Sequence, residues 1–258
     1  MSSTHLIIPD VQVREGVDIS HLSKIGRWAA EKKPDVIICL GDFADMPSLS
    51  TYDVGKKSFE GKRYTKDIEV AAEAMHQLMK PIWAEQDRLK ENKKKLWKPR
   101  MVLTMGNHEH RINRAIENDP KLEGLISTKD LEYELFGWEV HPFLEVVEID
   151  GVFYSHYFPT GVMGRAATTA SAMVSKLHSS CVAGHQQGKQ IAYGKRPDGS
   201  TITCIIAGSC YSHTEHYMDS QTNKHWRGFV VLHEVNNGSF DELFISLNYL
   251  KKKYGTSS

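Results

Sequence analysis

Three short runs of apolar residues stand out in the first half of the chain, and each ends abruptly in polar residues. The runs cover residues 6–8, 35–40 and 101–105, and the polar residues after them are Pro9-Asp10, Gly41-Asp42 and Gly106-Asn107-His108-Glu109. Runs this brief and aliphatic are typical of buried parallel strands, because a helix would need to be longer. The pattern therefore predicts three strands, each with polar side chains directly after its carboxyl end.

Amphipathic helical patterns lie between these runs. Residues 20–32 and 65–95 each carry an apolar stripe at helical spacing, and Pro81 predicts a kink in the second helix. The alternation of strand and helix implies right-handed crossovers and a mainly parallel sheet. Ligands of such sheets gather at the carboxyl ends of the strands, which is where the three polar groups fall.

The second half of the chain predicts a second sheet. Residues 144–149 and 152–155 read as a hairpin about Asp150-Gly151, and residues 163–178 as a helix rich in Ala and Met. Further strands are expected near 180–183, 188–193, 201–207, 228–234 and 240–246, with a turn at Pro197-Asp198-Gly199. Because no repeat or linker interrupts the pattern, residues 1–258 are interpreted as a single domain with a helical insertion at about 56–100.

Composition narrows the class of protein. The 258 residues are 40% hydrophobic and 25% charged, and Lys+Arg and Asp+Glu balance at 32 each, so no overall charge favours nucleic acid or a membrane surface. The chain has no run of the ~20 apolar residues that a membrane span needs, and no targeting signal at its start. The cysteines lack Cys-x-x-Cys spacing, which favours buried, reduced thiols. We therefore expect a cytoplasmic protein without membrane contact.

Side chains that can bind metal follow five strands in succession. They are Asp10 and Gln12, Asp42, Asn107 and His108, His156, and His185 and Gln187. Each motif alone has an ordinary interpretation, since Gly-Asp is usually a turn, Asn is a good helix cap and a lone His after a strand is usually just polar. The ordered set of five, however, predicts one site. Oxygen ligands mixed with imidazoles suit Mn, Fe, Zn or Mg rather than a closed structural zinc.

The same five blocks resemble the signature blocks of calcineurin-like metallophosphoesterases, in the correct order. They are Asp10-Val11-Gln12, Gly41-Asp42, Gly106-Asn107-His108-Glu109, His156 and Gly184-His185-Gln186-Gln187, and they span residues 10 to 187. The resemblance implies an α/β fold, namely a four-layer α/β/β/α sandwich of two mixed sheets flanked by helices. It also implies a hydrolase of phosphate esters that uses two divalent metal ions and a hydroxide bridging them.

The resemblance implies a role for each residue. The implied metal ligands are Asp10, Gln12, Asp42, Asn107, His156, His185 and Gln187, with Asp42 bridging the two ions. His108 would hydrogen-bond substrate oxygen or protonate the leaving group, and Glu109 would orient that neighbourhood without touching metal. Two cations held ~3.5–4 Å apart can clamp the attacking and leaving oxygens of an in-line displacement.

Two positions on one metal site depart from the family pattern. The family usually has His at positions 12 and 187, where this chain has Gln12 and Gln187. Gln can coordinate hard cations through its amide oxygen, so this site, completed by Asp10 and Asp42, would contain no imidazole. We expect Mn²⁺ or Mg²⁺ there in preference to Zn²⁺, with Fe²⁺ and Ni²⁺ also compatible. A single-metal enzyme, or a non-catalytic binding or scaffold protein with a vestigial site, is the competing hypothesis.

Several residues could contact the substrate, although each also has an ordinary surface or loop interpretation. Arg111 and Arg165 could reach a phosphate, and Tyr157, where the family commonly has Gly, could stack on a base. His213 lies in an aromatic, His-rich segment that could cover the site. Lys56 and Lys57 begin a basic cluster that could guide an anionic polymer.

The residues after Gly41-Asp42 bear on the substrate class. The protein-phosphatase branch of the family usually continues with an acidic-Arg-Gly signature, whereas this chain continues with Phe43-Ala44-Asp45-Met46. We therefore favour a phosphodiesterase or nuclease-type activity on a phosphate-ester substrate such as a nucleotide or nucleic acid. A phosphomonoesterase or a protein phosphatase is the alternative, because the fold serves all of these substrates.

Overall fold

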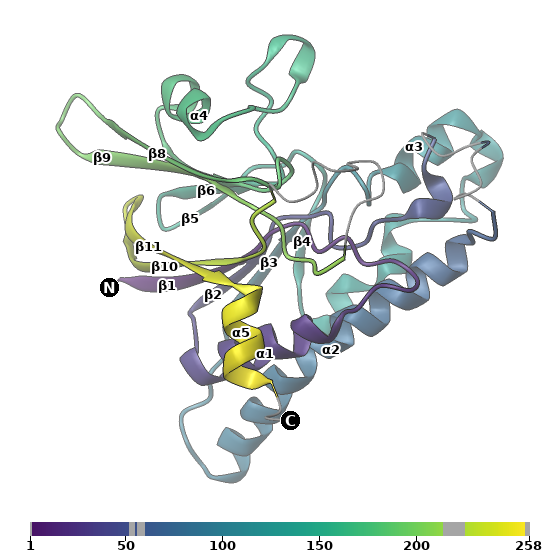
Figure 1. Cartoon of the computed structure of the whole chain (residues 1–258), viewed down its shortest axis with the longest axis horizontal. Coiled ribbons are helices and arrows are strands. Elements are labelled where there is room, and N and C mark those ends of the chain that lie inside the picture. Colours follow the sequence, from purple (N-terminus) through teal and green to yellow (C-terminus); the bar gives the residue numbers. More distant parts are fainter. Residues whose placement is uncertain (1, 52–54, 56–59, 214–224, 256–258) are drawn as a thin grey trace.

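Two mixed sheets pack face to face between outer layers of helix (Figure 1). The structure is a computed structural model that describes residues 2–51, 55, 60–213 and 225–255. Apolar side chains fill three layers: beneath the first sheet, between the sheets, and above the second sheet. This confirms the expected four-layer α/β/β/α sandwich.

The first sheet contains the three strands that the apolar runs predict. Its strands are β1 (Ser3–Ile8), β2 (Val36–Cys39), β3 (Arg100–Thr104), β4 (Glu139–His141), β10 (Gly228–Asn236) and β11 (Ser239–Ser246). They lie in the order β11-β10-β1-β2-β3-β4. Strands β1 to β4 are parallel, and β10 and β11 add an antiparallel pair at the β1 side. The carboxyl ends of β1, β2 and β3 therefore meet at one edge.

The second sheet brings further carboxyl ends to the same place. Its strands are β5 (Val147–Ile149), β6 (Val152–Ser155), β7 (Ser180–Ala183), β8 (Lys189–Lys195) and β9 (Thr201–Ala207), in the order β5-β6-β7-β9-β8. Strands β6, β7 and β9 are parallel, while β5 and β8 are antiparallel edges. The fully buried side chains of Ile7 and Ile38 face those of Val152 and Val182 in the layer between the sheets.

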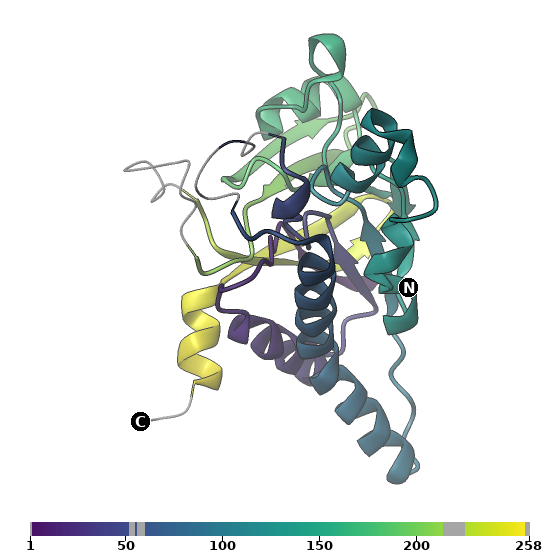
Figure 2. The same ribbon diagram turned by 90° about the vertical axis from the view of Figure 1, so that its right-hand side faces the viewer.

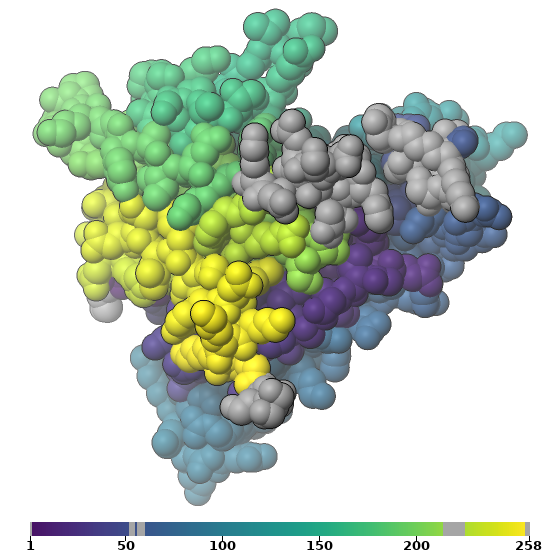
Figure 3. Space-filling view, viewed as in Figure 1, coloured from purple at the N-terminus to yellow at the C-terminus, as the bar shows by residue number. Residues whose placement is uncertain are grey.

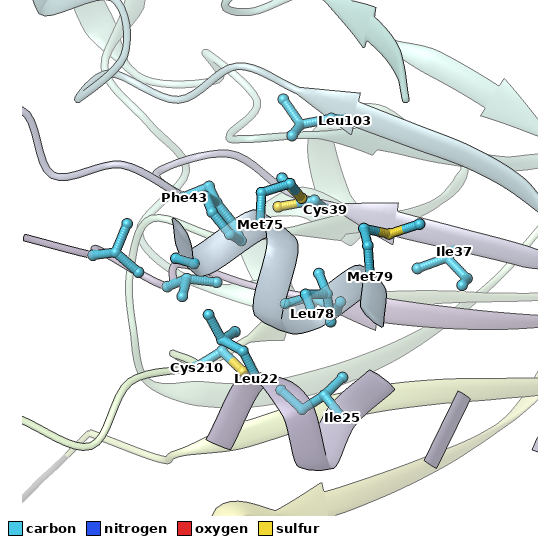
Figure 4. Packing of buried hydrophobic residues seen from close by; sticks show 14 of the residues in the cluster. Leu22, Ile25, Ile37, Cys39, Phe43, Met75, Leu78, Met79, Leu103 and Cys210 are labelled. Carbon is cyan, nitrogen blue, oxygen red and sulfur yellow. The ribbon is translucent and has the colours of Figure 1, made fainter. Parts of the chain in front are cut away.

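Helices α1 (Ser20–Lys32) and α2 (Tyr64–Glu91) cover the outer face of the first sheet. Figure 4 shows Leu22 and Ile25 of α1 beside Leu78 of α2, with Met75 and Met79 of α2 directed toward the sheet. Figure 2 shows how far the end of α2 extends beyond the rest of the molecule. In Figure 3 the terminal helix α5 (Leu247–Tyr254) lies at the front, below β10 and β11. On the second sheet, α4 (Ala170–Leu177) packs against β8 and β9.

Most of the predicted elements are present, and the differences have local causes. The helix expected at 163–178 begins only at Ala170, because the side chain of Thr169 caps it by accepting a hydrogen bond from Ala172 N. Short 3₁₀ helices occupy several of the connections: η1 (Pro47–Leu49), η3 (Pro120–Leu122), η4 (Thr128–Leu131), η5 (Tyr133–Phe136) and η6 (Val162–Gly164). The sequence patterns did not predict β4, α5 or α3 (Arg111–Asn118).

Two predictions about composition can be compared with this structure. The thiols of Cys39, Cys181, Cys204 and Cys210 are all buried and free, as expected. In the part of the chain that the structure describes, every helix is too short or too polar to cross a bilayer.

Candidate metal centre

The loops that follow the strands are held together before any side chain contributes. Beyond β1 and β2 the chain continues as a parallel pair, in which Gln12 N donates to Asp42 O at 2.8 Å. Gln12, Asp42, His185 and Gln187 all have left-handed backbones, with φ of 48°, 48°, 65° and 55°. For non-glycine residues this conformation costs about 1–2 kcal/mol each, and strain of this kind clusters at functional sites. The fold therefore stabilises a strained arrangement at these four positions.

Two glycines allow the carboxylates to approach the backbone closely. A Cβ at Gly106 would lie 2.1 Å from Asp42 Oδ1, and a Cβ at Gly184 would lie 2.4 Å from Asp10 Oδ1. Each carboxylate uses this space to accept a backbone hydrogen bond from the following loop. Asp42 Oδ1 accepts from His108 N, and Asp10 Oδ1 accepts from His185 N, both at 2.9 Å. The Gly-Asn-His motif after β3 thus binds the carboxylate of Asp42, and the Gly-His motif after β7 binds the carboxylate of Asp10.

His156 marks a point where acceptor atoms converge. Its Nδ1 lies 2.7 Å from the carbonyl oxygen of Leu40, which can only accept, so Nδ1 carries a proton. In the neutral ring, Nε2 then presents a lone pair to Asn107 Oδ1 at 3.0 Å and to Asp42 Oδ2 at 3.3 Å. With Asn107 Oδ1 facing Nε2, these three acceptors are satisfied by a cation among them, either a proton on Nε2 or a metal ion.

His185 and Asp10 complete the ring of ligand atoms. The donor atoms of Asp42, His156 and His185 all lie within 4.8 Å of one another, so these residues can hold a metal ion. Burial, helped by the positive charge of His156, lowers the pKa of His185 to about 4, which keeps its lone pair available. Asp10 is fully buried, and its Oδ2 has no hydrogen-bond partner among the described residues. An orphaned buried carboxylate oxygen is costly unless a cation binds it, and the donor set therefore fits divalent metal.

Metal binding is expected to depend on pH because protons occupy the same atoms. Burial alone would lower the pKa of His156, but the charge of Asp42 and the hydrogen bond to it raise that pKa to about 9. Burial raises the pKa of Asp10 to about 7, although the charge of His156 opposes this. Metal must therefore displace one proton between pH 7 and 9 and two below pH 7. We expect the apparent affinity for Mn²⁺ to rise about tenfold per pH unit from 7 to 9, more steeply below 7, and to level off above 9.

Calorimetric titration with Mn²⁺ in buffers of different ionisation enthalpy measures the proton release directly. About one proton per metal ion is expected at pH 8. His233→Gln, which removes an imidazole from β10 at a distance from the ligands, should leave the release unchanged. An affinity that does not vary with pH would show that metal does not take Nε2 of His156.

Gln12 and Gln187 follow Asp10 and His185 by two residues, and both side chains are largely buried. Gln187 Oε1 accepts a hydrogen bond from the hydroxyl of Tyr211 at 2.8 Å, and the same hydroxyl lies 2.7 Å from His225 Nδ1. Outer hydrogen bonds of this kind orient metal ligands. Sequence reasoning placed Tyr211 only in the aromatic, His-rich segment, because nothing in the sequence shows that its hydroxyl meets Gln187.

Comparison with known proteins adds a distant structural likeness. No family model and no curated protein matches this sequence. Among solved structures, the chain is similar to the phosphoesterase YfcE from E. coli. The two are 12% identical, with 94% of this chain and 100% of that chain covered and a TM-score of 0.41. A second solved structure is 9% identical, with 95% and 100% covered and a TM-score of 0.44. At these scores, function has to be inferred from the geometry of the site itself.

His108 stands beside the ligands and is fixed by a carboxylate that the sequence did not single out. Its Nδ1 lies 2.7 Å from Asp45 Oδ1, and its Nε2 lies 3.6 Å from Asp42 Oδ2. Burial disfavours the charged imidazole, but the charge of Asp42 and the hydrogen bond to Asp45 outweigh it and raise the pKa of His108. The sequence could have pointed to Asp45, because it is an acidic residue three positions after Asp42. It lies in the stretch that was compared with the protein-phosphatase signature.

Two arginines complete the surroundings of Asp45. Arg14 Nη1 lies 2.8 Å from Asp45 Oδ2, and Arg111 Nη1 donates to Asp45 O at 2.6 Å. Although burial would raise the pKa of Asp45, its hydrogen bond to His108 and these cations hold it well below its usual range. Arg111 Nη2 is 3.4 Å from His108 Nε2, so the guanidinium group lies directly beside this imidazole.

Glu109 is fully buried and organises the loops around Asp42. Its Oε2 accepts hydrogen bonds from Asp42 N at 3.0 Å and Gly106 N at 2.9 Å, and its Oε1 accepts from Ala44 N at 2.9 Å. Burial, together with the negative charge of Asp42, raises the pKa of Glu109. Glu109 is thus a positioning residue that ties the β2 loop to the β3 loop.

Removing Glu109 is expected to destabilise the fold. Glu109→Ala leaves three buried backbone N–H groups without an acceptor, at about 1–3 kcal/mol each, so we expect a loss of about 3 kcal/mol or more in the free energy of unfolding. Urea denaturation of the metal-free protein measures this. Glu109→Gln keeps one acceptor oxygen and should lose less, and Glu117→Ala on the exposed face of α3 should stay within about 0.5 kcal/mol of wild type. A loss below about 1 kcal/mol in Glu109→Ala would contradict this role.

The other residues proposed for substrate contact lie at different distances from the metal ligands. The ring centroid of Tyr157 is 4.9 Å from that of His185, so Tyr157 borders the site. The ring centroid of His213 is 4.4 Å from that of Tyr211, and Tyr211 in turn donates a hydrogen bond to Gln187. Arg165 is exposed in the segment after β6, and the structure gives its side chain no contact with the described site residues. Lys56 and Lys57 lie outside the described residues.

Proposed function

We propose that this protein is a metal-dependent phosphoesterase of the calcineurin-like type, with phosphodiesters as its preferred substrates. One observation carries the proposal: the acceptors Asp42 Oδ2, Asn107 Oδ1 and His156 Nε2 converge beside an imidazole that is itself held by a carboxylate. Acceptors that converge in this way suit divalent cations, and a fixed imidazole at their edge suits proton transfer.

The residues of the chain have separate tasks in this proposal. Asp10, Asp42, Asn107, His156 and His185 would hold divalent metal, and Gln12 and Gln187 would add amide oxygens as further ligands. Bound divalent ions would supply Lewis-acid activation of water and of the phosphoryl group. Asp45 accepts from His108 Nδ1 and favours the charged imidazole, and only in that charged ring does Nε2 also carry a proton that it could donate to the substrate. Arg111 presents a second cationic group beside it.

The charge balance around Asp45 supports a diester over a monoester. Both Arg14 and Arg111 are bound to Asp45, which neutralises part of their charge. A phosphodiester carries one negative charge at the reacting phosphate, whereas a monoester carries up to two and needs more free cationic groups. A leaving alkoxide also needs a proton, which His108 is placed to give.

Hydrolysis of bis-p-nitrophenyl phosphate and p-nitrophenyl phosphate, measured side by side, tests the proposal. The metal-stripped protein would receive Mn²⁺, Mg²⁺, Ni²⁺ and Zn²⁺ in turn, with Asp42→Asn as the blank. We expect turnover that needs Mn²⁺ or Mg²⁺, favours the diester and disappears in the blank. A preference for the monoester would overturn the diester assignment. Absence of turnover with every metal would favour the binding protein with a vestigial site.

A further inference from the structure

A row of rings borders one side of the candidate metal centre. We call His110, Phe143 and Tyr157 the aromatic wall. His110 stacks on Phe143 with centroids 4.8 Å apart and planes at 27°, and Phe143 meets the ring of Tyr157 edge-on at 5.5 Å. The wall continues to the ligands, because Tyr157 is 4.9 Å from His185 and 5.9 Å from His156. Phe143 also lies 6.2 Å from His156, so Tyr157 and Phe143 both border the ligands and His110 lies beyond Phe143.

The wall is assembled from loops at the carboxyl ends of both sheets. His110 follows β3 and Phe143 follows β4 in the first sheet, whereas Tyr157 follows β6 in the second. All three rings are partly exposed. Phe143 also packs on the core beneath the first sheet, so burial accounts for part of its position. Tyr157 belongs to none of the three buried layers, and the structure gives its hydroxyl no hydrogen bond to a described residue.

Partly exposed rings at this place call for a planar partner. The neighbouring ligands are charged or polar, so a flat apolar surface contributes nothing to holding metal or phosphate. Nucleobases, in contrast, stack on aromatic side chains with a gain that depends little on which base is present. A base joined through its sugar to a phosphate at His156 and His185 would lie along the ring of Tyr157.

We propose that the aromatic wall binds the nucleobase of a nucleoside phosphate ester whose phosphate lies at the metal centre. This rests on the proposed function, because it names the substrate class of that same site. Tyr157 is the central contact, since its ring touches both the ligand His185 and Phe143. The wall would thus determine specificity without taking part in the chemical step.

Calorimetric binding of AMP and of ribose 5-phosphate, the kind of monoester that hydrolysis of a diester releases, to the Mn²⁺-loaded protein tests the subsite. A His108→Ala background suppresses turnover of either ligand and affects both equally. Because AMP has a base where ribose 5-phosphate has a hydroxyl group, the ratio of their dissociation constants reports the contribution of the base. We expect AMP to bind about tenfold or more tightly than ribose 5-phosphate. Equal binding, or no binding of either ligand at millimolar concentration, would overturn the subsite.

Variants of the wall locate the effect. Tyr157→Leu should bring the ratio close to one while leaving the affinity for ribose 5-phosphate unchanged, and Tyr157→Phe should restore the ratio. Tyr249→Leu removes a more exposed Tyr from α5 and should change neither constant. A ratio that survives in Tyr157→Leu would show that the base lies elsewhere.

Two further comparisons separate the possible failures and the possible sources of the nucleotide. Generic ester hydrolysis without any AMP preference would remove the subsite and keep the proposed function. A preference for AMP without hydrolysis would keep the subsite and remove the proposed function. Binding of a thymidine dinucleotide and a ten-residue oligothymidylate distinguishes a free nucleotide from a strand end. Equal affinities indicate a small nucleotide and tighter binding of the longer strand indicates nucleic acid, and either result supports the subsite.

Discussion

Asp42→Asn is expected to abolish metal-dependent hydrolysis and to weaken Mn²⁺ binding by more than about 100-fold, because loss of outer hydrogen bonds alone costs 10–100-fold at metal sites. Asp42 Oδ2 lies 3.3 Å from His156 Nε2, and Asp42 is one of the three residues whose ligand atoms converge. Asparagine keeps the size of the side chain and an oxygen that can accept from His108 N. The variant thus removes the charge with little change in shape.

Two measurements accompany the activity assay in this case. Calorimetric titration gives the loss of Mn²⁺ affinity without reference to turnover, and thermal unfolding of the metal-free protein shows that the variant is folded. Asp241→Asn on the exposed edge of β11 is the matched control and should bind Mn²⁺ as the wild type does. Wild-type Mn²⁺ affinity in Asp42→Asn would show that the convergent acceptors are not where metal binds.

The fold was predictable from the sequence where local patterns and burial agree. The runs at 6–8, 35–40 and 101–105 became β1, β2 and β3, because their side chains are buried on both faces of a parallel sheet. The three-residue strand β4 was missed because its register with β3 is set by tertiary contact rather than by an apolar run. A strand of this length carries no periodic signal.

The sequence predicted which residues belong to the candidate site better than it predicted the contacts between them. Asp10, Asp42 and His156 stood out because polar residues after buried strands must meet at one edge. Asp45 and Tyr211 did not stand out, because each matters through a contact that only the structure shows. Asp45 contacts His108 Nδ1, and Tyr211 donates to Gln187 Oε1. Arg165 is exposed after β6, and its contact with a substrate phosphate stays a prediction.

His108→Ala is expected to lower turnover by about 10²–10⁴-fold, the usual contribution of a positioned proton donor. Affinity for Mn²⁺ should stay nearly unchanged, since alanine retains the backbone N–H that Asp42 Oδ1 accepts. The pKa of His108 is raised, chiefly by Asp42 and Asp45 against the effect of burial, so the protonated form persists above the usual range of histidine. At saturating Mn²⁺, turnover that needs this proton is fully present below the raised pKa and falls as the pH rises through it. That alkaline limb should vanish in His108→Ala.

The choice of leaving group separates the two roles that His108 could have. If His108 protonates the leaving oxygen, its loss should harm a diester with a basic alkoxide leaving group far more than one that releases p-nitrophenol, which departs without a proton. If His108 only donates a hydrogen bond to a phosphate oxygen, both substrates should slow by the same factor. Asp45→Asn keeps the shape of the residue but removes the charge that raises the pKa of His108. It should therefore move the alkaline limb to lower pH and slow turnover less than His108→Ala. An unshifted limb in Asp45→Asn would mean that another group titrates there.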